Sequence, residues 1–349
     1  NIVGDHATYH LQYDTPLTSD IAGVAAPVSR WVHSSASSDE LPQDAANAVA
    51  AASEAPGRVA TLILPADVSW GECSSGPAAP AAAVPARYTY DDAVEACASA
   101  LRCGEPAMIV IGGHVHDAEL ELAAAIAATT GARIAVETFA TRLPWGAGQP
   151  QCERITYLAE MVIEQLKTVR KLILVATREP ASFFAYPGVP GRVAPEDCEG
   201  LVLADPHQDR IDALERLAAA LRTARVEPPR CELALPALPQ SGPLGTAVVA
   251  DVIAALLPEH AILVDEGVTC GMEVFARTRT ARPHQWVSQT GGAIGWGIPA
   301  AVGAAIAAPE RKVICLEGDG SAMYTIQALW TMAREQLDVT VVLFANRDY

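Results

Sequence analysis

The sequence predicts an α/β protein with three similar open parallel sheets and helices on both faces of each. Two observations support this class. Alanine-rich stretches with helical spacing alternate along the chain with Val/Ile/Leu runs of strand length. Half of the 349 residues are hydrophobic and 19% are charged, which is typical of a globular protein with large cores. The length suffices for two or three domains of ordinary size.

Two stretches rich in proline and alanine divide the chain, at residues 74–87 and 226–242. Neither has a helical or strand period, which is typical of linkers. Three domains are therefore expected, over residues 1–73, 88–225 and 243–349. The chain begins with residues typical of a strand interior and ends just after a strong strand, so we expect a chain truncated at both ends.

Each segment contains its own predicted elements. The first has a helix over 39–54 and a strand over 58–65. In the second segment, the strands are expected over 107–111, 132–137, 171–176 and 201–204, and the helices over 91–102, 118–129 and 209–221. In the third, the strands are expected over 261–265, 312–316 and 339–344. The second segment therefore resembles an open Rossmann-like sheet with helical cover.

The net charge of −17 argues against nucleic acid as a partner, because an acidic surface repels the phosphate backbone. No apolar run is long enough to span a membrane. The eight cysteines lack the C-x-x-C spacing of a zinc or redox site, so we expect reduced thiols in a cytoplasmic protein.

The strongest chemical signal lies between residues 312 and 346. A buried strand runs into Gly318-Asp319-Gly320, a helix is expected over 325–335, and a second buried strand leads to Asn346. A parallel βαβ unit would place Asp319 and Asn346 at the carboxyl ends of two strands, where open α/β sheets bind ligands. A carboxylate and an amide oxygen suit Mg²⁺, which takes its other ligands from phosphate and water.

The glycines of this motif point to a diphosphate. Gly318 and Gly320 would let backbone amides approach the anion without an intervening Cβ, and the start of the following helix would favour negative charge. A Gly-Asp-Gly alone is usually only a turn. The Asn that follows the Asp by 27 residues makes the pattern a more specific sign of a metal–diphosphate site.

This arrangement resembles the signature of thiamine diphosphate-dependent enzymes, a Gly-Asp-Gly followed by a spacer and paired asparagines. Here Ala345 replaces the first asparagine, and Asn346 remains as the expected metal ligand. The resemblance implies Mg²⁺ ligands at Asp319, Asn346 and the main-chain carbonyl of Asp348. It also implies diphosphate contacts around Ser321.

Two further blocks carry the resemblance. Residues 290–301 are similar to the loop and helix start that hold thiamine in its bent form. The resemblance implies that the Gly292 carbonyl meets the aminopyrimidine and that Ile294 is the apolar wedge beneath the rings. Residues 265–269 are similar to a diphosphate-contacting stretch, with Thr269 the best candidate. Taken alone, each block also fits an ordinary turn before a helix.

The resemblance extends over the whole chain and is nearest to the acetolactate synthase large subunit, with benzoylformate decarboxylase next. It implies the back half of a pyrimidine-binding domain, a central domain and a diphosphate-binding domain that lacks its tail. It also implies decarboxylation and carboligation of a small 2-oxo acid, with two pyruvates giving 2-acetolactate and CO₂. The alternatives are a simple 2-oxo acid decarboxylase and a non-catalytic cofactor-binding remnant. FAD is not expected, because no dinucleotide glycine fingerprint follows a strand.

The family's activating glutamate lies in a region expected before Asn1, so this chain alone should show no turnover. The family also builds each site from two subunits, which implies a homodimer or a higher homo-oligomer.

Other signals have simpler explanations. His114 and His116 could bind a metal, but a loop position after a strand is favoured. His6 is expected to be structural rather than catalytic. Phe183, Phe184 and Tyr186 could approach a substrate pocket, but a place in the core is favoured.

Overall fold

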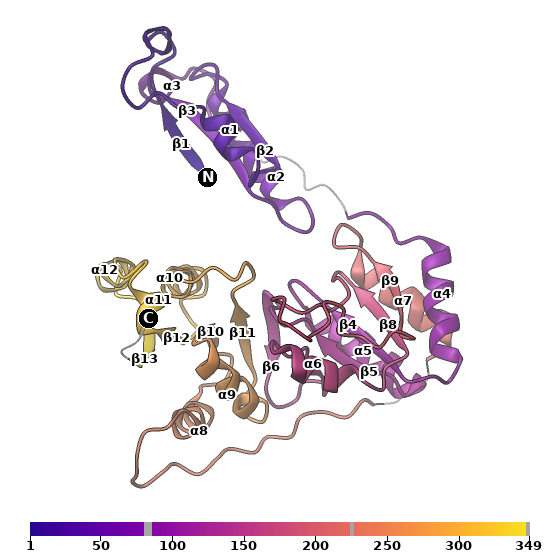
Figure 1. Cartoon of the computed structure of the whole chain (residues 1–349). Coiled ribbons are helices and arrows are strands. Elements are labelled where there is room, and N and C mark those ends of the chain that lie inside the picture. Colours follow the sequence, from indigo (N-terminus) through magenta and orange to yellow (C-terminus); the bar gives the residue numbers. More distant parts are fainter. Residues whose placement is uncertain (80–85, 224–226, 347–349) are drawn as a thin grey trace. The chain divides into compact units, whose positions relative to one another are not determined.

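The computed structural model describes residues 1–79, 86–223 and 227–346, and Figure 1 labels its helices and strands. The chain divides into two compact units: residues 1–88 with 206–209, and residues 89–205 with 210–349. The predicted α/β class is confirmed, since helices connect the strands of parallel sheets. None of the described helices combines the length and the apolar composition that crossing a bilayer requires.

The first unit contains a parallel sheet in the order β1-β3-β2. Its elements are β1 (Ile2–Asp5), η1 (Leu11–Tyr13), α1 (Ile21–Ala25), β2 (Trp31–Ser34), α2 (Leu41–Ser53), β3 (Ala60–Pro65) and α3 (Ala66–Trp70). The central strand β3 is buried along nearly its whole length, as its run of apolar residues predicts. The helix and the strand predicted here correspond to α2 and β3.

The second unit begins with a parallel sheet in the order β7-β5-β4-β8-β9. The elements of this part are α4 (Asp91–Arg102), β4 (Ala107–Ile111), α5 (Asp117–Thr130), β5 (Arg133–Val136), β6 (Arg142–Trp145), β7 (Glu153–Arg154), α6 (Ala159–Leu166), β8 (Lys171–Val175), β9 (Glu199–Ala204) and α7 (Arg210–Leu221). The four strands and three helices predicted here are confirmed, with ends that shift by at most two residues.

The other sheet of this unit has the order β13-β12-β10-β11-β6. The remaining elements are α8 (Thr246–Leu256), β10 (Ile262–Glu266), α9 (Thr269–Thr278), β11 (His284–Ser288), α10 (Gly297–Ala307), β12 (Val313–Gly318), α11 (Asp319–Ala322), α12 (Ala328–Arg334) and β13 (Val339–Phe344). The edge strand β6 runs antiparallel to β11. A wholly parallel sheet was predicted here, and for this edge strand the prediction was wrong.

Side chains of β10 alternate between the two faces of this sheet. Leu263 packs in one apolar cluster with α8 and α9, whereas Ile262 and Val264 pack in another with α10 and α12. Figure 1 shows these two helix pairs on opposite faces. Because strand side chains have a period of two, the last two residues of β10 must also point to opposite faces.

An aromatic contact holds the edge strand β6 to α9 and β11 within this sheet. The Trp145 ring of β6 stacks on Phe275 of α9, with centroids 4.2 Å apart, and its indole N–H donates to the Phe275 carbonyl at 3.0 Å. Trp286 of β11 meets the same phenyl ring edge-on. All three side chains are at least 91% buried and belong to the same apolar cluster as Ile109 of β4, so the core continues between the two sheets of this unit.

Candidate functional site

The carboxyl ends of four neighbouring parallel strands form one edge of the second sheet. In the ladders, Gly318 of β12 lies opposite Phe344 of β13, Glu266 of β10 opposite Glu317 of β12, and Asp265 opposite Ser288 of β11. All the predicted site residues within the described part of the chain lie at or just after these four strand ends. The edge is therefore the candidate site, as expected for an open α/β sheet.

Asp319 and Asn346 lie one and two residues beyond the Gly318–Phe344 pair, so the topology brings them to the same place on the edge. Asp319 begins the short helix α11 and its carboxylate accepts the Gly320 N–H at 3.1 Å. Asp348, the third expected ligand, lies outside the described residues. Across the described ranges, no three His, Cys, Asp or Glu side chains gather as a metal site. A magnesium site of the expected kind uses one carboxylate, one side-chain amide and one main-chain carbonyl, so it would contain no such group of three side chains.

The helix expected over 325–335 is shorter than predicted. α12 begins only at Ala328, and turns over residues 323–327 separate it from α11. Ser321, a predicted diphosphate contact, is buried in α11.

The turn after β10 carries a strained backbone. Val268 has φ +48° and ψ −112°, a conformation that a β-branched residue rarely adopts. The Asp265 carboxylate holds this turn by accepting the Gly267 N–H at 3.0 Å. Thr269, the predicted diphosphate contact, is exposed directly after the strained residue and begins α9.

The buried Asp265 carboxyl group lies under the start of α9. A Cβ on Gly271 would be 2.1 Å from its Oδ1, so only glycine fits there. Burial raises the pKa of Asp265 to about 6, although the Arg154 guanidinium opposes this rise. Arg154 lies over the Phe275 ring, 4.8 Å from its centroid.

The loop over residues 290–297 joins β11 to α10 and depends on glycine. Gly292 has φ +69° and Gly295 has φ +96°, both in the left-handed region. A Cβ on Gly295 would lie 2.6 Å from the Cβ of Tyr324, which is too close for any side chain. The Thr325 hydroxyl donates to the Gly295 carbonyl at 2.7 Å, so the loop is tied to the segment after α11. Ile294, the predicted wedge, is 38% exposed on this loop.

Two buried glutamates lie behind this loop, and neither was predicted as a site residue from the sequence. Glu266 ends β10, Glu317 lies opposite it in β12, and their exposed fractions are 1% and 0%. Burial and the Glu266 charge raise the pKa of Glu317 to about 8. The sequence offered one sign of them, because both are acidic residues at the carboxyl ends of apolar strands.

Two buried polar atoms at the ends of the loop have no hydrogen-bond partner among the described residues. They are Oε1 of Gln289, directly after β11, and Nε1 of Trp296, directly before α10. Buried polar atoms in native proteins nearly always have partners. An edge with unpaired polar atoms, oxygen donors and glycine backbone fits a site that a polar cofactor completes.

An aromatic cluster borders the same loop. The Phe183 ring lies beside Gly292, since its Cζ is 3.5 Å from where a Cβ on that glycine would lie. Ring centroids separate Phe183 from Phe184 by 5.0 Å, from Tyr157 by 5.1 Å and from Phe139 by 5.8 Å. Phe183 and Phe184 are 51% and 52% exposed and Tyr186 is 54% exposed, so the favoured core assignment was wrong.

The histidines considered in the sequence lie elsewhere. The rings of His114 and His116 stack 4.1 Å apart in the loop before α5. Burial, and then the charge of His116, lower the pKa of His114 to about 4. His6, in the first unit, has its Nε2 3.2 Å from the Pro16 carbonyl. Neither group lies on the loops of the candidate site.

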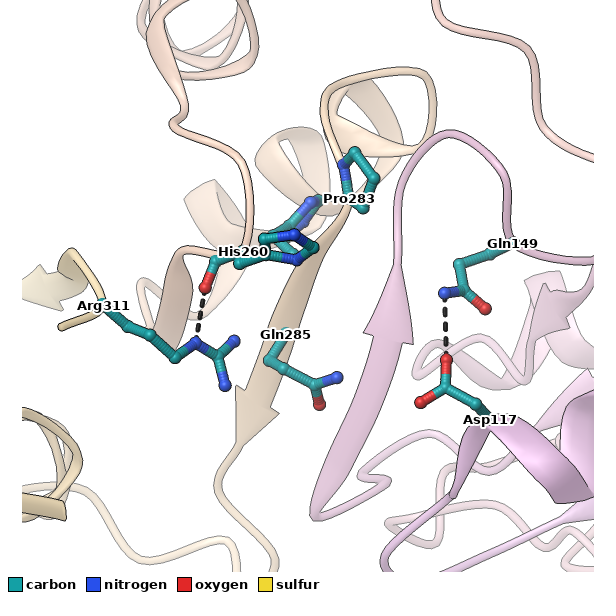
Figure 2. Close-up of a pocket in the computed structure, with 7 residues that line it drawn as sticks. Asp117, Gln149, His260, Pro283, Gln285 and Arg311 are labelled. Carbon is teal, nitrogen blue, oxygen red and sulfur yellow. Dashed lines mark hydrogen bonds between the residues drawn. The ribbon is translucent and has the colours of Figure 1, made fainter. Parts of the chain in front are cut away.

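A cavity of about 240 Å³ lies at the opposite edge of the sheet (Figure 2). Its lining includes His260 before β10, His284 at the start of β11 and Arg311 before β12. Arg311 donates from Nε to the His260 carbonyl at 2.6 Å, as Figure 2 shows. Because these residues lie at the amino ends of the strands, this cavity is separate from the candidate site.

Comparisons with known proteins agree with the geometry. Residues 267–349 match the C-terminal thiamine pyrophosphate-binding domain of thiamine pyrophosphate enzymes. The whole chain is 49% identical to a Mycobacterium tuberculosis protein provisionally named acetolactate synthase large subunit IlvX, of which it spans 66%. It is 29% identical over 95% of its length to benzoylformate decarboxylase of Pseudomonas aeruginosa, of which it spans 65%.

The fold has close relatives among solved structures. Benzoylformate decarboxylase from Polynucleobacter necessarius superposes over 100% of this chain and 69% of its own, with a TM-score of 0.80 and 22% identity. At this identity the likeness concerns the fold alone. With the matched domain and the relative of 49% identity, these findings make the chain a member of the thiamine diphosphate-dependent enzyme family.

Proposed function

We propose that the protein processes 2-oxo acids with thiamine diphosphate and Mg²⁺. The observation that carries this proposal is the convergence of four strand ends, which places Asp319 and Asn346 beside the turn at Thr269 and the loop over 290–297. The family implies thiamine diphosphate as the cofactor.

The chain's own residues have distinct proposed tasks. Asp319 and Asn346 would hold Mg²⁺ with oxygen atoms, together with the Asp348 main-chain carbonyl. The backbone of Gly318 and Gly320 would take the diphosphate.

Side chains and the glycine loop would complete the grip on the cofactor. Thr269 and Ser321 would add hydroxyl donors to the diphosphate. The Gly292 carbonyl would accept a hydrogen bond from the aminopyrimidine, and Ile294 would support the rings from below.

When bound, thiamine diphosphate would supply a nucleophilic carbon and an electron sink for the decarboxylation of a 2-oxo acid. The protein contributes position and electrostatics. The strained turn at Val268 and the two left-handed glycines fix the loops before the cofactor arrives, which reduces the ordering cost of binding.

The first candidate reaction is acetolactate synthase-like carboligation, in which two pyruvates give 2-acetolactate and CO₂. The relative of 49% identity, with its provisional synthase name, favours this candidate. We further propose a cytoplasmic homodimer or higher homo-oligomer, with each site completed by a second copy of the chain.

The second candidate is simple decarboxylation of a bulky 2-oxo acid, and the aromatic cluster favours it. Phe183 lies beside Gly292, the residue proposed to hold the aminopyrimidine, while half of its own surface stays exposed. An exposed aromatic ring beside the reacting centre would accommodate an aryl group better than a methyl group.

Product analysis of the full-length protein distinguishes these candidates, because this chain spans only about two thirds of the length of its relatives. The protein would be supplied with thiamine diphosphate, Mg²⁺ and either pyruvate or benzoylformate, and the products identified by NMR. Acetolactate supports the first candidate and benzaldehyde the second. Cofactor binding without turnover of either acid would support a non-catalytic remnant, and absence of cofactor binding would contradict the proposal.

A further inference from the structure

Glu266 is the residue that ties the end of β10 to the loop over 290–297. Its carboxylate accepts the backbone N–H groups of Gly295 and Gly297. The side chain is only 1% exposed, so water does not compete for these hydrogen bonds. Hydrogen bonds to a buried carboxylate are among the stronger ones in proteins.

Strand geometry explains why this side chain reaches the loop. Val264 faces α10, and Glu266 follows it by two residues, so its side chain faces α10 as well. The preceding residue, Asp265, faces α9 and holds the other turn. Two consecutive acids at one strand end therefore hold two different loops of the same site.

Gly297 completes the fit between strand and loop. A Cβ at this position would lie 2.5 Å from Oε2 of Glu317 and 2.7 Å from Oε2 of Glu266. The loop amide can approach the Glu266 carboxylate only because residue 297 has no side chain. Glu317 therefore lies beside Glu266 under the same glycine and provides a matched position for comparison.

Gly295 is held through both of its peptide groups. Its N–H donates to Glu266, and its carbonyl accepts from the Thr325 hydroxyl at 2.7 Å. Ile294 shares the first of these peptide groups. The direction of the Ile294 side chain is therefore set by the bond to Glu266.

We propose that Glu266 is a positioning residue, which fixes the loop over 290–297 and so aims Ile294 at the cofactor. The proposal rests on the proposed function, because Ile294 supports thiamine only if thiamine binds. Glu266 itself is buried behind the loop and takes no direct part in the reaction.

Two glutamine variants of the full-length protein separate this role from a general effect of buried charge. Glu266→Gln and Glu317→Gln each replace one buried carboxyl group of the same pair. Only Glu266→Gln replaces one of the two acceptor oxygens under Gly295 and Gly297 with an amide that cannot accept. Hydrogen–deuterium exchange of the loop peptide, without cofactor, measures how well the loop amides are protected. Calorimetric titration with thiamine diphosphate and Mg²⁺ measures the cofactor affinity.

For Glu266→Gln, we expect loop amide exchange to rise about tenfold or more and cofactor affinity to fall by a similar factor. For Glu317→Gln, both should stay within about threefold of wild type. Peptides of β12 serve as an internal check on folding. If Glu266→Gln does not fold, Glu266→Asp, which keeps both oxygens on a shorter side chain, should give a smaller loss of both quantities.

Equal exchange and affinity in Glu266→Gln and Glu317→Gln would overturn the positioning role while leaving the proposed function intact. The positioning role would also be overturned if Glu266→Asp matched wild type in both measurements. Wild-type protein that binds no thiamine diphosphate would instead overturn the proposed function, and the inference with it.

Discussion

Gly318 and Phe344 lie opposite each other on the last rung of the ladder between β12 and β13. A residue with an oxygen-bearing side chain follows each strand: Asp319 comes directly after Gly318, and Asn346 comes two residues after Phe344. The two residues are 27 positions apart in sequence, yet the parallel pairing brings them to one point of the sheet edge.

The oxygen donors should control metal-dependent binding. Replacing Asp319 with Ala, or Asn346 with Ala, should lower the affinity for thiamine diphosphate in Mg²⁺ by about thirtyfold or more, since each removes a ligand of a buried charge, a loss of roughly 2–5 kcal/mol. Calorimetric titration would measure it. Asp338→Ala is the matched control, because this acid precedes β13 at the other edge and is 70% exposed. An equal loss in the control would count against the assignment.

Gly295 should not tolerate a side chain. Gly295→Ala adds a Cβ 2.6 Å from that of Tyr324 at φ +96°, so the loop must shift and cofactor affinity should fall at least about tenfold. Gly303→Ala in α10 is the control, since no atom lies within 4 Å of its added Cβ. That variant should keep its affinity and gain about 0.5–1 kcal/mol in the free energy of unfolding. Titration and urea unfolding would test both, and an unaffected Gly295→Ala would contradict the loop's role.

His284 should make the fold sensitive to acid. Burial lowers the pKa of His284 to about 4 from an ordinary value of 6.5. The unfolded state therefore binds more protons between these pH values, and the free energy of unfolding should fall by roughly 3 kcal/mol as the pH decreases through them. The Nδ1 of His284 donates to the Arg282 carbonyl at 2.8 Å. His284→Asn keeps a comparable donor but cannot titrate.

Urea unfolding at about pH 7.5 and about pH 4.5 would measure this difference, since the two conditions lie on either side of the ordinary histidine pKa. The wild-type protein should lose more of its unfolding free energy between these pH values than His284→Asn does. Parallel losses in the two proteins would show that another group controls acid stability.

The aromatic cluster should influence substrate choice. Phe183→Ala removes the ring that lies beside Gly292. We expect kcat/KM to fall several-fold for benzoylformate and to change little for pyruvate, since an aromatic contact with the substrate is worth about 0.5–1.5 kcal/mol. Tyr186→Ala is the control, because Tyr186 lies at the end of the cluster, 6.4 Å from Phe184. A loss that is equal for both substrates would exclude a role in choosing between them.

Long apolar runs made much of the fold predictable. The strands β4 and β13 and the helix α4 begin and end where their sequence patterns place them. The strands β6 and β11 escaped prediction. β6 has only four residues, one of them Pro144, and β11 begins with His284 and Gln285 and has only two apolar residues. Both depend on partners distant in sequence, which a local pattern does not contain.

The site was predictable where it follows from strand order. Asp319 and Asn346 come after two strands with clear apolar runs, so a parallel βαβ unit is sufficient to bring them together. The contact of Glu266 with Gly295 spans 29 residues and depends on how one loop folds over another strand. The position of Phe183 beside Gly292 was also not predicted, because an aromatic residue in a loop gives no local sign of which glycine it will lie against.

The most direct test of the account is the position of the metal ion in a crystal of the full-length protein grown with Mn²⁺ and thiamine diphosphate. Anomalous diffraction would locate the ion without ambiguity. We predict one ion per site, at coordination distance from the Asp319 carboxylate and the Asn346 amide oxygen, in contact with the diphosphate. An ion elsewhere, or side chains of Asp319 and Asn346 that point away from each other, would contradict the account.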